Sequence, residues 1–340
     1  MLPKPALRAA AARLLDADPA CVALTPLPGG RNNRVYRVAV RGREPVVLKH
    51  YHWSEQDQRD RLDREWRFLA YAWDRGVRAV PRPIAQDRAA RIGIYAALPG
   101  RRPWAEEIAA WHIDAAADFV VALNAPPRDP RALPPGAEAC FTLSDHLSLI
   151  DRRVHRLCSL DRDAPHGDEA ARFVRNLLVP AWDAVRARVE EAARALGIAP
   201  DAPPGAAAFC VSPSDFGFHN ALEDAGALFF VDFEYAGQDD AAKLVCDFFC
   251  QPELPVPEAH RARFLSRVAD GLGLDEAGRA RCLLLLDAYR IKWTCIVMNE
   301  FLPAGAARRA FAASGARAAA PLAQLAKARH AIDGLKAARA

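Results

Sequence analysis

The stretch that decides the fold is Ser212-Pro213-Ser214-Asp215-Phe216-Gly217-Phe218-His219-Asn220, which follows the apolar run 208–211. A second apolar segment, Leu228-Phe229-Phe230-Val231-Asp232-Phe233-Glu234, comes a few residues later, after a turn. A hairpin centred near Ala225 would place Asn220 almost opposite Phe230, within about two residues of Asp232. We therefore predict that Asp215, Asn220 and Asp232 converge at one mouth of this hairpin.

These three residue types suit one chemistry. A carboxylate base, together with Asn and Asp side chains on Mg²⁺, is the set of groups that kinases use for phosphoryl transfer. Asp215 is the candidate base, and Asn220 and Asp232 are the candidate magnesium ligands. An Asp followed five residues later by Asn is a weak pattern alone, because both residues are common in turns. The hypothesis therefore depends on matching residues elsewhere in the chain.

A glycine-containing turn near the N-terminus supplies one match. The stretch Leu27-Pro28-Gly29-Gly30-Arg31-Asn32-Asn33 lies between apolar segments. Such a turn can place backbone N–H groups against a phosphate. We assign Gly29, Gly30 and Asn32 to nucleotide binding.

A lysine and a glutamate supply the second match. Lys49 ends a short β-branched run, where a strand lysine can reach the phosphates of a nucleotide. Glu65 lies three residues after Leu62 and four before Leu69 in a predicted helix at 57–75, so all three share its inward face. A carboxylate on an apolar face needs a partner, because burying it alone is costly. Lys49 is the candidate partner, and both residues are predicted to serve the nucleotide.

The order of elements predicts two lobes. Leu98-Pro99-Gly100 resembles a hinge, and the residues after it are mostly helical, apart from one β segment at 208–232. We expect a smaller mixed lobe, 1–98, and a larger helical lobe, 99–340, with ligands bound between them. Within the first lobe, alternation predicts strands at 35–40, 45–48 and 92–95, and a helical period places Leu62, Trp66, Leu69 and Trp73 on one face of the helix.

Composition excludes several classes of protein. The 340 residues are 51% hydrophobic and 26% charged, as in ordinary globular proteins. No apolar run approaches the ~20 residues of a membrane span. The net charge of +4 comes from well-mixed residues, which argues against a nucleic-acid partner. Eight cysteines without a CxxC pair indicate reduced thiols in a cytoplasmic protein. The sequence does not indicate an oligomeric state.

These motifs together resemble those of the aminoglycoside phosphotransferase and choline-kinase-like family, over roughly residues 24–247. Asp215 and Asn220 match the family's catalytic motif, Asp232 matches its metal-binding Asp, and Lys49 and Glu65 match its strand Lys and helix Glu. The resemblance implies an α+β, two-lobed, protein-kinase-like fold, whose small lobe has an antiparallel sheet and one helix. It also implies ATP and Mg²⁺ as cofactors. One departure is Pro213, where the family usually has His.

Other polar residues have competing interpretations. Three acidic residues after the metal Asp are interpreted as helix caps and loop supports: Asp239, Asp240 and Asp247. His219 is interpreted as structural, and His50 and His52 as solvated residues at a strand end. Four residues of a polar helix either line the acceptor pocket or belong to an ordinary amphipathic helix: Arg290, Lys292, Asn299 and Glu300.

The leading hypothesis is an ATP-dependent small-molecule kinase, a phosphotransferase that acts on a hydroxyl of a sugar, amino sugar or amino alcohol. Few acidic residues near the catalytic stretch lack an assigned role, and the net charge of +4 does not attract cations, which favours a neutral or anionic acceptor over a polycation. One alternative is a catalytically silent nucleotide-binding pseudokinase or scaffold. Another is a protein kinase, but Glu234 replaces the Gly of Asp-Phe-Gly and no Ala-Pro-Glu segment follows.

Overall fold

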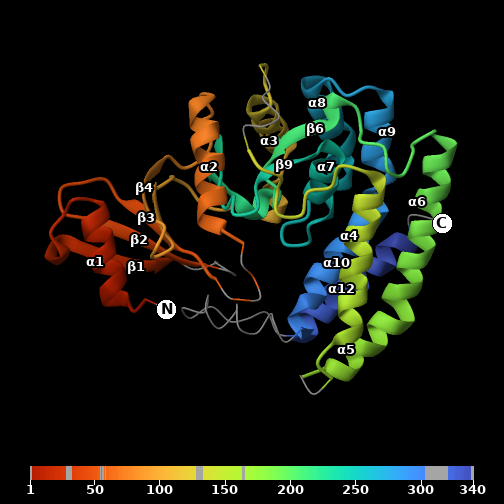
Figure 1. The fold of residues 1–340 in the computed structure, drawn as a ribbon, viewed down its shortest axis with the longest axis horizontal. Coiled ribbons are helices and arrows are strands. Elements are labelled where there is room, and N and C mark those ends of the chain that lie inside the picture. The colour runs from red at the N-terminus through yellow and green to blue at the C-terminus, as the bar shows by residue number, and fades with distance from the viewer. Residues whose placement is uncertain are drawn as a thin grey trace. The chain divides into compact units, whose positions relative to one another are not determined.

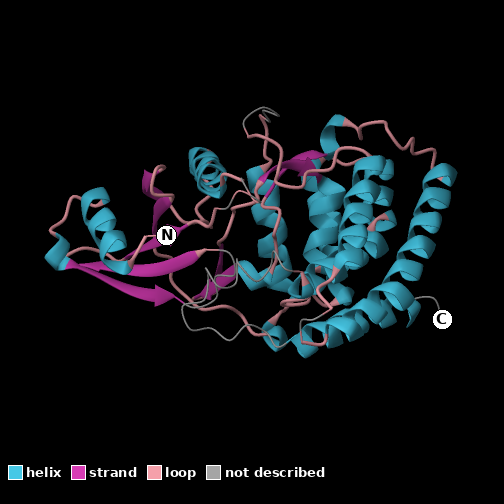
Figure 2. Ribbon diagram, turned by 60° about the horizontal axis from the view of Figure 1, so that its bottom comes forward, coloured by secondary structure: helices cyan, strands magenta, loops and turns pink. Residues whose placement is uncertain are grey.

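The computed structural model describes residues 2–27, 33–53, 55, 57, 59–127, 133–162, 165–302 and 321–337. These residues form an α+β fold, with an antiparallel sheet in the N-terminal part and helices in most of the rest (Figures 1 and 2). In this described part of the chain, no helix is both long and apolar enough to cross a membrane.

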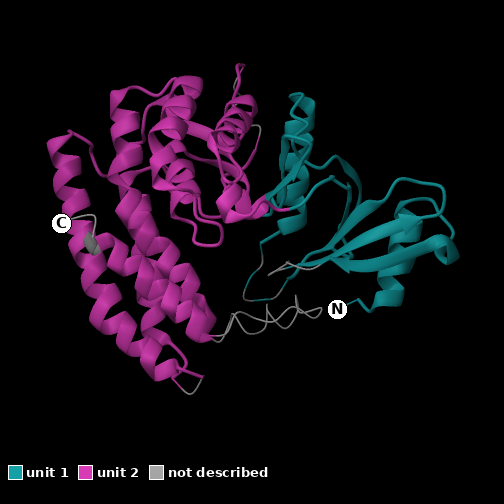
Figure 3. Cartoon of the chain, turned by 180° about the vertical axis from the view of Figure 1, so that it is seen from behind, with its two compact units in different colours: residues 1–101, 221–235, 307–318 teal, residues 102–220, 236–306, 319–340 magenta. Residues whose placement is uncertain are grey.

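The chain packs into two compact units (Figure 3). Among the described residues, unit 1 contains 2–101 and 221–235, and unit 2 contains 102–220, 236–302 and 321–337. The chain therefore leaves unit 1, builds part of unit 2, and then contributes fifteen more residues, 221–235, to unit 1. The functional division into 1–98 and 99–340 stays a prediction, and the packing units differ from it by counting 221–235 with the N-terminal residues.

Unit 1 is built on a five-stranded antiparallel sheet of strand order β1-β2-β3-β5-β4. Alternating and β-branched residues predicted β2, β3 and β5, whereas β1 and β4 each contain a proline that obscures the strand pattern. The strands are β1 (Val22–Leu27), β2 (Arg34–Val40), β3 (Val46–His50), β4 (Pro83–Asp87) and β5 (Ile92–Ala96).

Each face of this sheet carries a helix. Helix α1 (Lys4–Leu14) packs Leu7 into a core with Val38 and Leu48 of the sheet. Successive side chains of a strand point to opposite faces, so Leu48 on the α1 side places Lys49 on the other face. There Lys49 meets a carboxylate of the second helix, α2 (Arg61–Asp74).

Helix α2 begins at a capping residue, because the Asp60 carboxylate accepts the backbone N–H of Asp63 at 2.9 Å. Its inner face is Leu62, Glu65, Phe68, Leu69 and Ala72, all buried. Trp66 and Trp73, which share the helical spacing of Leu62 and Leu69, are half-buried at the margin of this face. The Trp73 indole reaches the carbonyl of Pro81, so the ring lies at the helix margin where its N–H finds a partner.

The predicted hairpin near Ala225 is present. Strands β7 (Ala221–Asp224) and β8 (Ala227–Phe230) pair antiparallel, with Ala221 opposite Phe230. Two backbone contacts attach the hairpin to the rest of unit 1: the Phe230 N–H donates to the carbonyl of Ala79 at 2.7 Å, and the Glu223 N–H donates to the carbonyl of Arg101 at 2.7 Å.

Unit 2 is mainly helical. Its two-stranded sheet pairs β6 (Phe209–Ser212) with β9 (Gly237–Asp240). These strands lie before and after the residues 221–235 that belong to unit 1. The helix α10 contacts α4, α6, α7 and α12, and Figure 1 shows α4 and α12 beside it. The helices are α3 (Ala110–Leu123), α4 (Leu143–Arg156), α5 (Gly167–Phe173), α6 (Val179–Ala195), α7 (Ala241–Cys250), α8 (Arg261–Leu272), α9 (Glu276–Leu284), α10 (Leu286–Met298) and α12 (Pro321–Ala337).

Buried ion pairs join these helices. Asp240 caps α7 by accepting the N–H of Ala242 at 2.7 Å. Lys243 lies between Asp239, at 2.8 Å, and Asp247, at 3.1 Å. Asp247 also accepts from Lys292 of α10 at 2.5 Å. The prediction that the three acidic residues cap and support structure is therefore confirmed.

The polar residues of α10 and its C-terminal turn make contacts inside unit 2. Lys292 is buried against Asp247, and Arg290 pairs with Asp287 and Glu258. The Asn299 side chain accepts from Arg156 at 2.8 Å. A helix surrounded by neighbours needs its polar groups paired in this way. The assignment of these residues to an acceptor pocket stays untested.

Gly100 should be intolerant of any side chain. Its φ is +94°, and an added Cβ would lie 2.3 Å from the carbonyl oxygen of Glu223, where the hairpin attaches to unit 1. We expect Gly100→Ala to lower the free energy of unfolding by ~2–4 kcal/mol, from left-handed strain plus a backbone clash.

The matched control is Gly226→Ala. Gly226 has φ +77°, but its Cβ would meet nothing within 4 Å in the described part of the chain. Only the conformational cost of ~1–2 kcal/mol applies there. Urea denaturation of both variants measures the difference, and equal losses would contradict the steric argument.

Candidate active site

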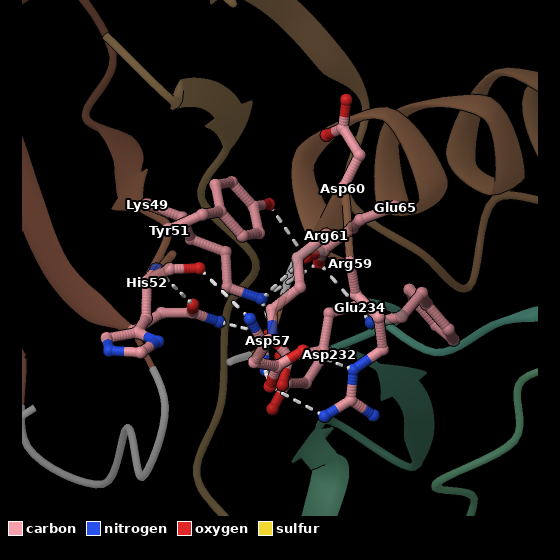
Figure 4. Close-up of polar contacts among 12 residues, drawn as sticks. Lys49, Tyr51, His52, Asp57, Arg59, Asp60, Arg61, Glu65, Asp232 and Glu234 are labelled. Carbon is pink, nitrogen blue, oxygen red and sulfur yellow. Dashed lines mark hydrogen bonds and ion pairs between the residues drawn. The ribbon is translucent and has the colours of Figure 1, made fainter. Parts of the chain in front are cut away.

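Lys49 is the centre of the polar cluster in unit 1. Its Nζ atom lies 2.9 and 2.8 Å from the two carboxylate oxygens of Glu65 and 2.7 Å from Oδ1 of Asp232 (Figure 4). Glu65 comes from α2, and Asp232 follows β8 in the segment 221–235. The structure thus brings together three of the predicted site residues, with Lys49 8% and Glu65 2% exposed.

The electrostatic environment keeps Lys49 charged. Burial by itself lowers the pKa of Lys49, but the nearby carboxylates of Asp232 and Glu65 outweigh this and raise the pKa above its ordinary value. Asp232 also adopts a left-handed backbone, with φ +72°, which non-glycine residues rarely do. Such strain persists only where the surroundings enforce it, and it is common at functional sites.

Two tyrosines extend the cluster behind Glu65. The Tyr51 hydroxyl donates to Oε2 of Glu65 at 2.7 Å and lies 2.7 Å from the Tyr95 hydroxyl. Burial, followed by the charge of Glu65, raises the pKa of Tyr51, so its proton stays available for this hydrogen bond. An added Cβ on Gly93 would lie 2.3 Å from the Tyr95 hydroxyl, which explains the glycine at that position. The sequence pattern did not identify either tyrosine.

A second buried acid, Glu234, was also missed. It accepts from the Asn33 side chain and pairs with the fully buried Arg61 at 3.5 Å. Arg61 donates in turn to the carbonyl of His52 at 3.0 Å, as Figure 4 shows. Burial, followed by the charge of Asp232, raises the pKa of Glu234, against the opposing effect of Lys49 and Arg61. The available signal was its position two residues after Asp232 in an apolar run.

The interpretation of His50 and His52 as solvated was wrong. They are 5% and 7% exposed. The backbone pairing continues beyond the end of β3, since the Tyr51 N–H donates to the carbonyl of Arg91 at 2.9 Å. The chain around the two histidines therefore stays covered. Burial, followed by the charge of Arg34, lowers the pKa of His50 to about 4. His50 is therefore neutral near pH 7.

In unit 2, the predicted catalytic stretch forms a tight loop after β6. The Asn220 amide nitrogen donates to the backbone carbonyl of Asp215 at 2.9 Å. Ser214 has φ +66°, and its N–H donates to Oγ of Ser212 at 3.1 Å. Asn124, the residue after α3, holds β6 through two hydrogen bonds to the backbone of Val211. The spacing of five residues between Asp215 and Asn220 thus reflects one closed turn.

The predicted site residues fall into three groups. Lys49, Glu65 and Asp232 contact one another in unit 1. Asp215 and Asn220 contact each other in unit 2. The glycine-turn residues Gly29, Gly30 and Asn32 lie outside the described residues.

Comparisons with known proteins identify the family and the fold of the chain. Residues 23–285 match the phosphotransferase enzyme family. A search of curated proteins found no match. Among solved structures, a choline kinase from Cryptosporidium parvum Iowa II is 13% identical, with a TM-score of 0.59 over 98% of this chain and 97% of its own.

Two other structures have similar folds. The macrolide 2'-phosphotransferase MphH from Brachybacterium faecium is 17% identical, with a TM-score of 0.56 over 92% of this chain and 98% of its own. The amicoumacin kinase hAmiN, in complex with AMP-PNP and Ca²⁺, is 15% identical, with a TM-score of 0.59 over 98% of this chain and 94% of its own.

The fold is therefore that of the protein-kinase-like phosphotransferases. The chain belongs to the phosphotransferase enzyme family, since the match covers most of its length. This confirms the resemblance seen in the sequence and the predicted enzyme class, a small-molecule kinase.

Removal of the Lys49 charge should destabilise the protein, because the buried carboxylate of Glu65 would lose its cation. We expect Lys49→Met to lower the free energy of unfolding by ~3–5 kcal/mol, because Glu65 would remain buried without its cation. The double variant Lys49→Met/Glu65→Met should recover at least about half of this loss. Urea denaturation at pH 7 measures the free energy of unfolding of both variants.

The control is Arg186→Met. Arg186 also contacts two acidic residues, Asp151 and Glu190, but all three side chains are 37–44% exposed. Exposed pairs contribute about 0–1 kcal/mol. If Lys49→Met lowers the free energy of unfolding no more than this control does, the buried charge of Lys49 does not stabilise the fold.

Proposed function

We propose that the chain is an ATP-dependent phosphotransferase that moves the γ-phosphoryl group of ATP to a hydroxyl of a small molecule. The observation that carries the proposal is Lys49, fixed between Glu65 and Asp232 on the sheet of unit 1. A charged lysine oriented by a helix glutamate is how kinases bind the phosphates of ATP. The nucleotide and divalent cation in the amicoumacin kinase structure support the same cofactors here.

Asp232 in unit 1 and Asn220 in unit 2 each have the chemistry of a magnesium ligand. Mg²⁺ binds proteins through one or two carboxylate or amide oxygens and takes further ligands from phosphates and water. The Asp232 side chain is 38% exposed, and the Asn220 nitrogen donates to Asp215, so Oδ1 of Asn220 is the atom proposed as a metal ligand. Among the described residues, no group of three or more His, Cys, Asp or Glu side chains could hold a metal alone. When bound, Mg²⁺ neutralises charge on the phosphate oxygens.

The chain's own residues then have separate tasks. Lys49, oriented by Glu65, binds phosphate oxygens. Asp215 accepts or orients the proton of the acceptor hydroxyl. The rate gain comes from positioning and charge neutralisation, because phosphoryl transfer needs little covalent chemistry from the protein.

The acceptor is tested with a panel. Purified protein is incubated with Mg²⁺ and either [γ-³²P]ATP or [γ-³²P]GTP. The acceptor is kanamycin, choline, ethanolamine, glucose, ribose or inositol. We expect transfer from ATP to a neutral or anionic hydroxyl compound. Efficient transfer to kanamycin, at or above ~10⁴ M⁻¹s⁻¹ in kcat/KM, would contradict the acceptor class. ATP binding without transfer to any compound or to water would favour the silent nucleotide-binding alternative.

Asp215→Asn should lower kcat by ~10²–10⁴-fold, the usual loss when a positioned base is removed. Nucleotide affinity should change little, because Asp215 is assigned to the acceptor. The control is Asp270→Asn, at a surface residue of unit 2 whose side chain is 67% exposed. Initial rates and nucleotide titrations compare the two variants. Turnover by Asp215→Asn equal to that of the control would remove Asp215 from the mechanism.

Asp232→Ala should weaken nucleotide binding with Mg²⁺ more than binding without it. The carboxylate is proposed as a metal ligand, so its loss acts through the cation that bridges to the phosphates. Calorimetric titration of ATP, with Mg²⁺ and with EDTA, measures both affinities. An equal loss in both conditions would mean that Asp232 only neutralises Lys49.

A further inference from the structure

His219 lies beside the proposed base on the same loop. Its Nε2 atom is 3.1 Å from Oδ1 of Asp215, and it belongs to the short 3₁₀ turn Phe218–Asn220. The two side chains differ in exposure, with 10% for His219 and 31% for Asp215. A buried imidazole thus contacts one oxygen of a partly exposed carboxylate.

The surroundings of the ring determine which nitrogen carries the proton. The Nδ1 atom is buried and meets no hydrogen-bonding group among the described residues. A proton on Nδ1 would create a buried donor without an acceptor, which is costly. The ring therefore has its proton on Nε2 and donates it to Asp215.

Two further hydrogen bonds fix the backbone on both sides of Asp215. Asn220 donates to the Asp215 carbonyl, and Ser212 accepts the N–H of Ser214. Pro213 has no polar side chain to offer. The phenyl rings of Phe216 and Phe218 are buried, so the loop is anchored on both sides of Gly217.

We propose that His219 is a positioning residue for phosphoryl transfer: its Nε2–H holds the Asp215 carboxylate in the orientation that receives the acceptor hydroxyl. The inference rests on the proposed function, and it changes the earlier interpretation of His219 as structural. A charge-assisted hydrogen bond from a ring with little freedom to move restricts the carboxylate to one rotamer. Misplacement of a catalytic group by ~1 Å can cost about 10²-fold in rate.

Gly217 makes this arrangement possible. An added Cβ at Gly217 would lie 2.8 Å from Nδ1 and 3.0 Å from Cε1 of His219. Any side chain at this position would push the ring away from its place beside Asp215. The glycine in the stretch Asp-Phe-Gly-Phe-His-Asn is therefore explained by the histidine two residues later.

The experiment compares His219→Ala with His219→Gln. Glutamine has an N–H donor that can take the place of Nε2–H but lacks the ring. The measurement is the single-turnover rate of transfer from [γ-³²P]ATP to the best acceptor of the panel, together with the ATP dissociation constant and the acceptor KM. We expect a ~10–100-fold slower rate for the Ala variant, binding constants within about twofold, and recovery by Gln to within about fivefold of wild type.

A second pair of variants tests the same contact from the other side. Gly217→Ala should lower the single-turnover rate of transfer, as His219→Ala does. Gly205→Ala is the control, since its Cβ would meet nothing within 4 Å in the described part of unit 2, and it should match wild type. Thermal denaturation of all four variants identifies any that fail to fold.

The outcomes separate the two levels of the argument. If wild type transfers phosphate but His219→Ala does so at the wild-type rate, the inference is wrong and the proposed function stands. If folded Gln and Ala variants are equally slow, the ring acts by packing alone, and the positioning role is also wrong. If wild type transfers phosphate neither to an acceptor nor to water, the proposed function is wrong, and the inference is wrong with it.

Discussion

The rest of the structure depends on the burial of one positive charge, that of Lys49. A cation with 8% exposure cannot remain inside a protein without acidic partners, and Lys49 has two, from segments 16 and 183 residues further along the chain. The sheet presents the lysine on the face opposite to α1, α2 presents Glu65, and the segment 221–235 presents Asp232. These three parts of unit 1 must therefore fold together for any of the charges to be tolerated.

The same logic governs unit 2, where polar groups are buried to position a loop. Asn124 fixes β6 through both backbone groups of Val211, and the chain then enters the turn that carries Asp215. On the partner strand β9, Asp239 accepts the N–H of Cys140 and pairs with Lys243. Strand pairing and buried charges thus hold the two ends of the segment that leaves for unit 1. The chemistry that we propose for Asp215 uses a loop whose backbone has little freedom.

Residue spacing predicted those parts of the fold and site that are local. The hairpin near Ala225 and the inward position of Glu65 follow from turn chemistry and helical periodicity, and both are present. The pairing of Lys49 with Glu65 followed from the need to neutralise a buried acid. The contacts of Glu234 with Arg61, and of Tyr51 with Glu65, join residues whose relation only the tertiary fold creates. No periodic pattern contains that information.

The errors have a similar origin. Trp66 and Trp73 have the spacing of Leu62 and Leu69, but they are only half-buried, whereas the charged Glu65 is buried beside Lys49. His50 and His52 looked like the solvated end of a strand, while the chain beyond the strand remained covered. In both places, the tertiary requirement of a buried polar group outweighed a local preference.

The discontinuity of unit 1 has a consequence for the order of folding during synthesis. The first 101 residues contain the sheet, Lys49 and Arg61, but Asp232 and Glu234 are translated only after more than a hundred residues of unit 2. Until residue 235 has left the ribosome, both cations lack these acidic partners, and the nascent N-terminal unit cannot reach its final charge balance. Domains generally complete folding as they emerge, N-terminal first. Here unit 1 begins to fold first, but it cannot be completed until residues 221–235 have been synthesised. About half of unit 2 is synthesised before them.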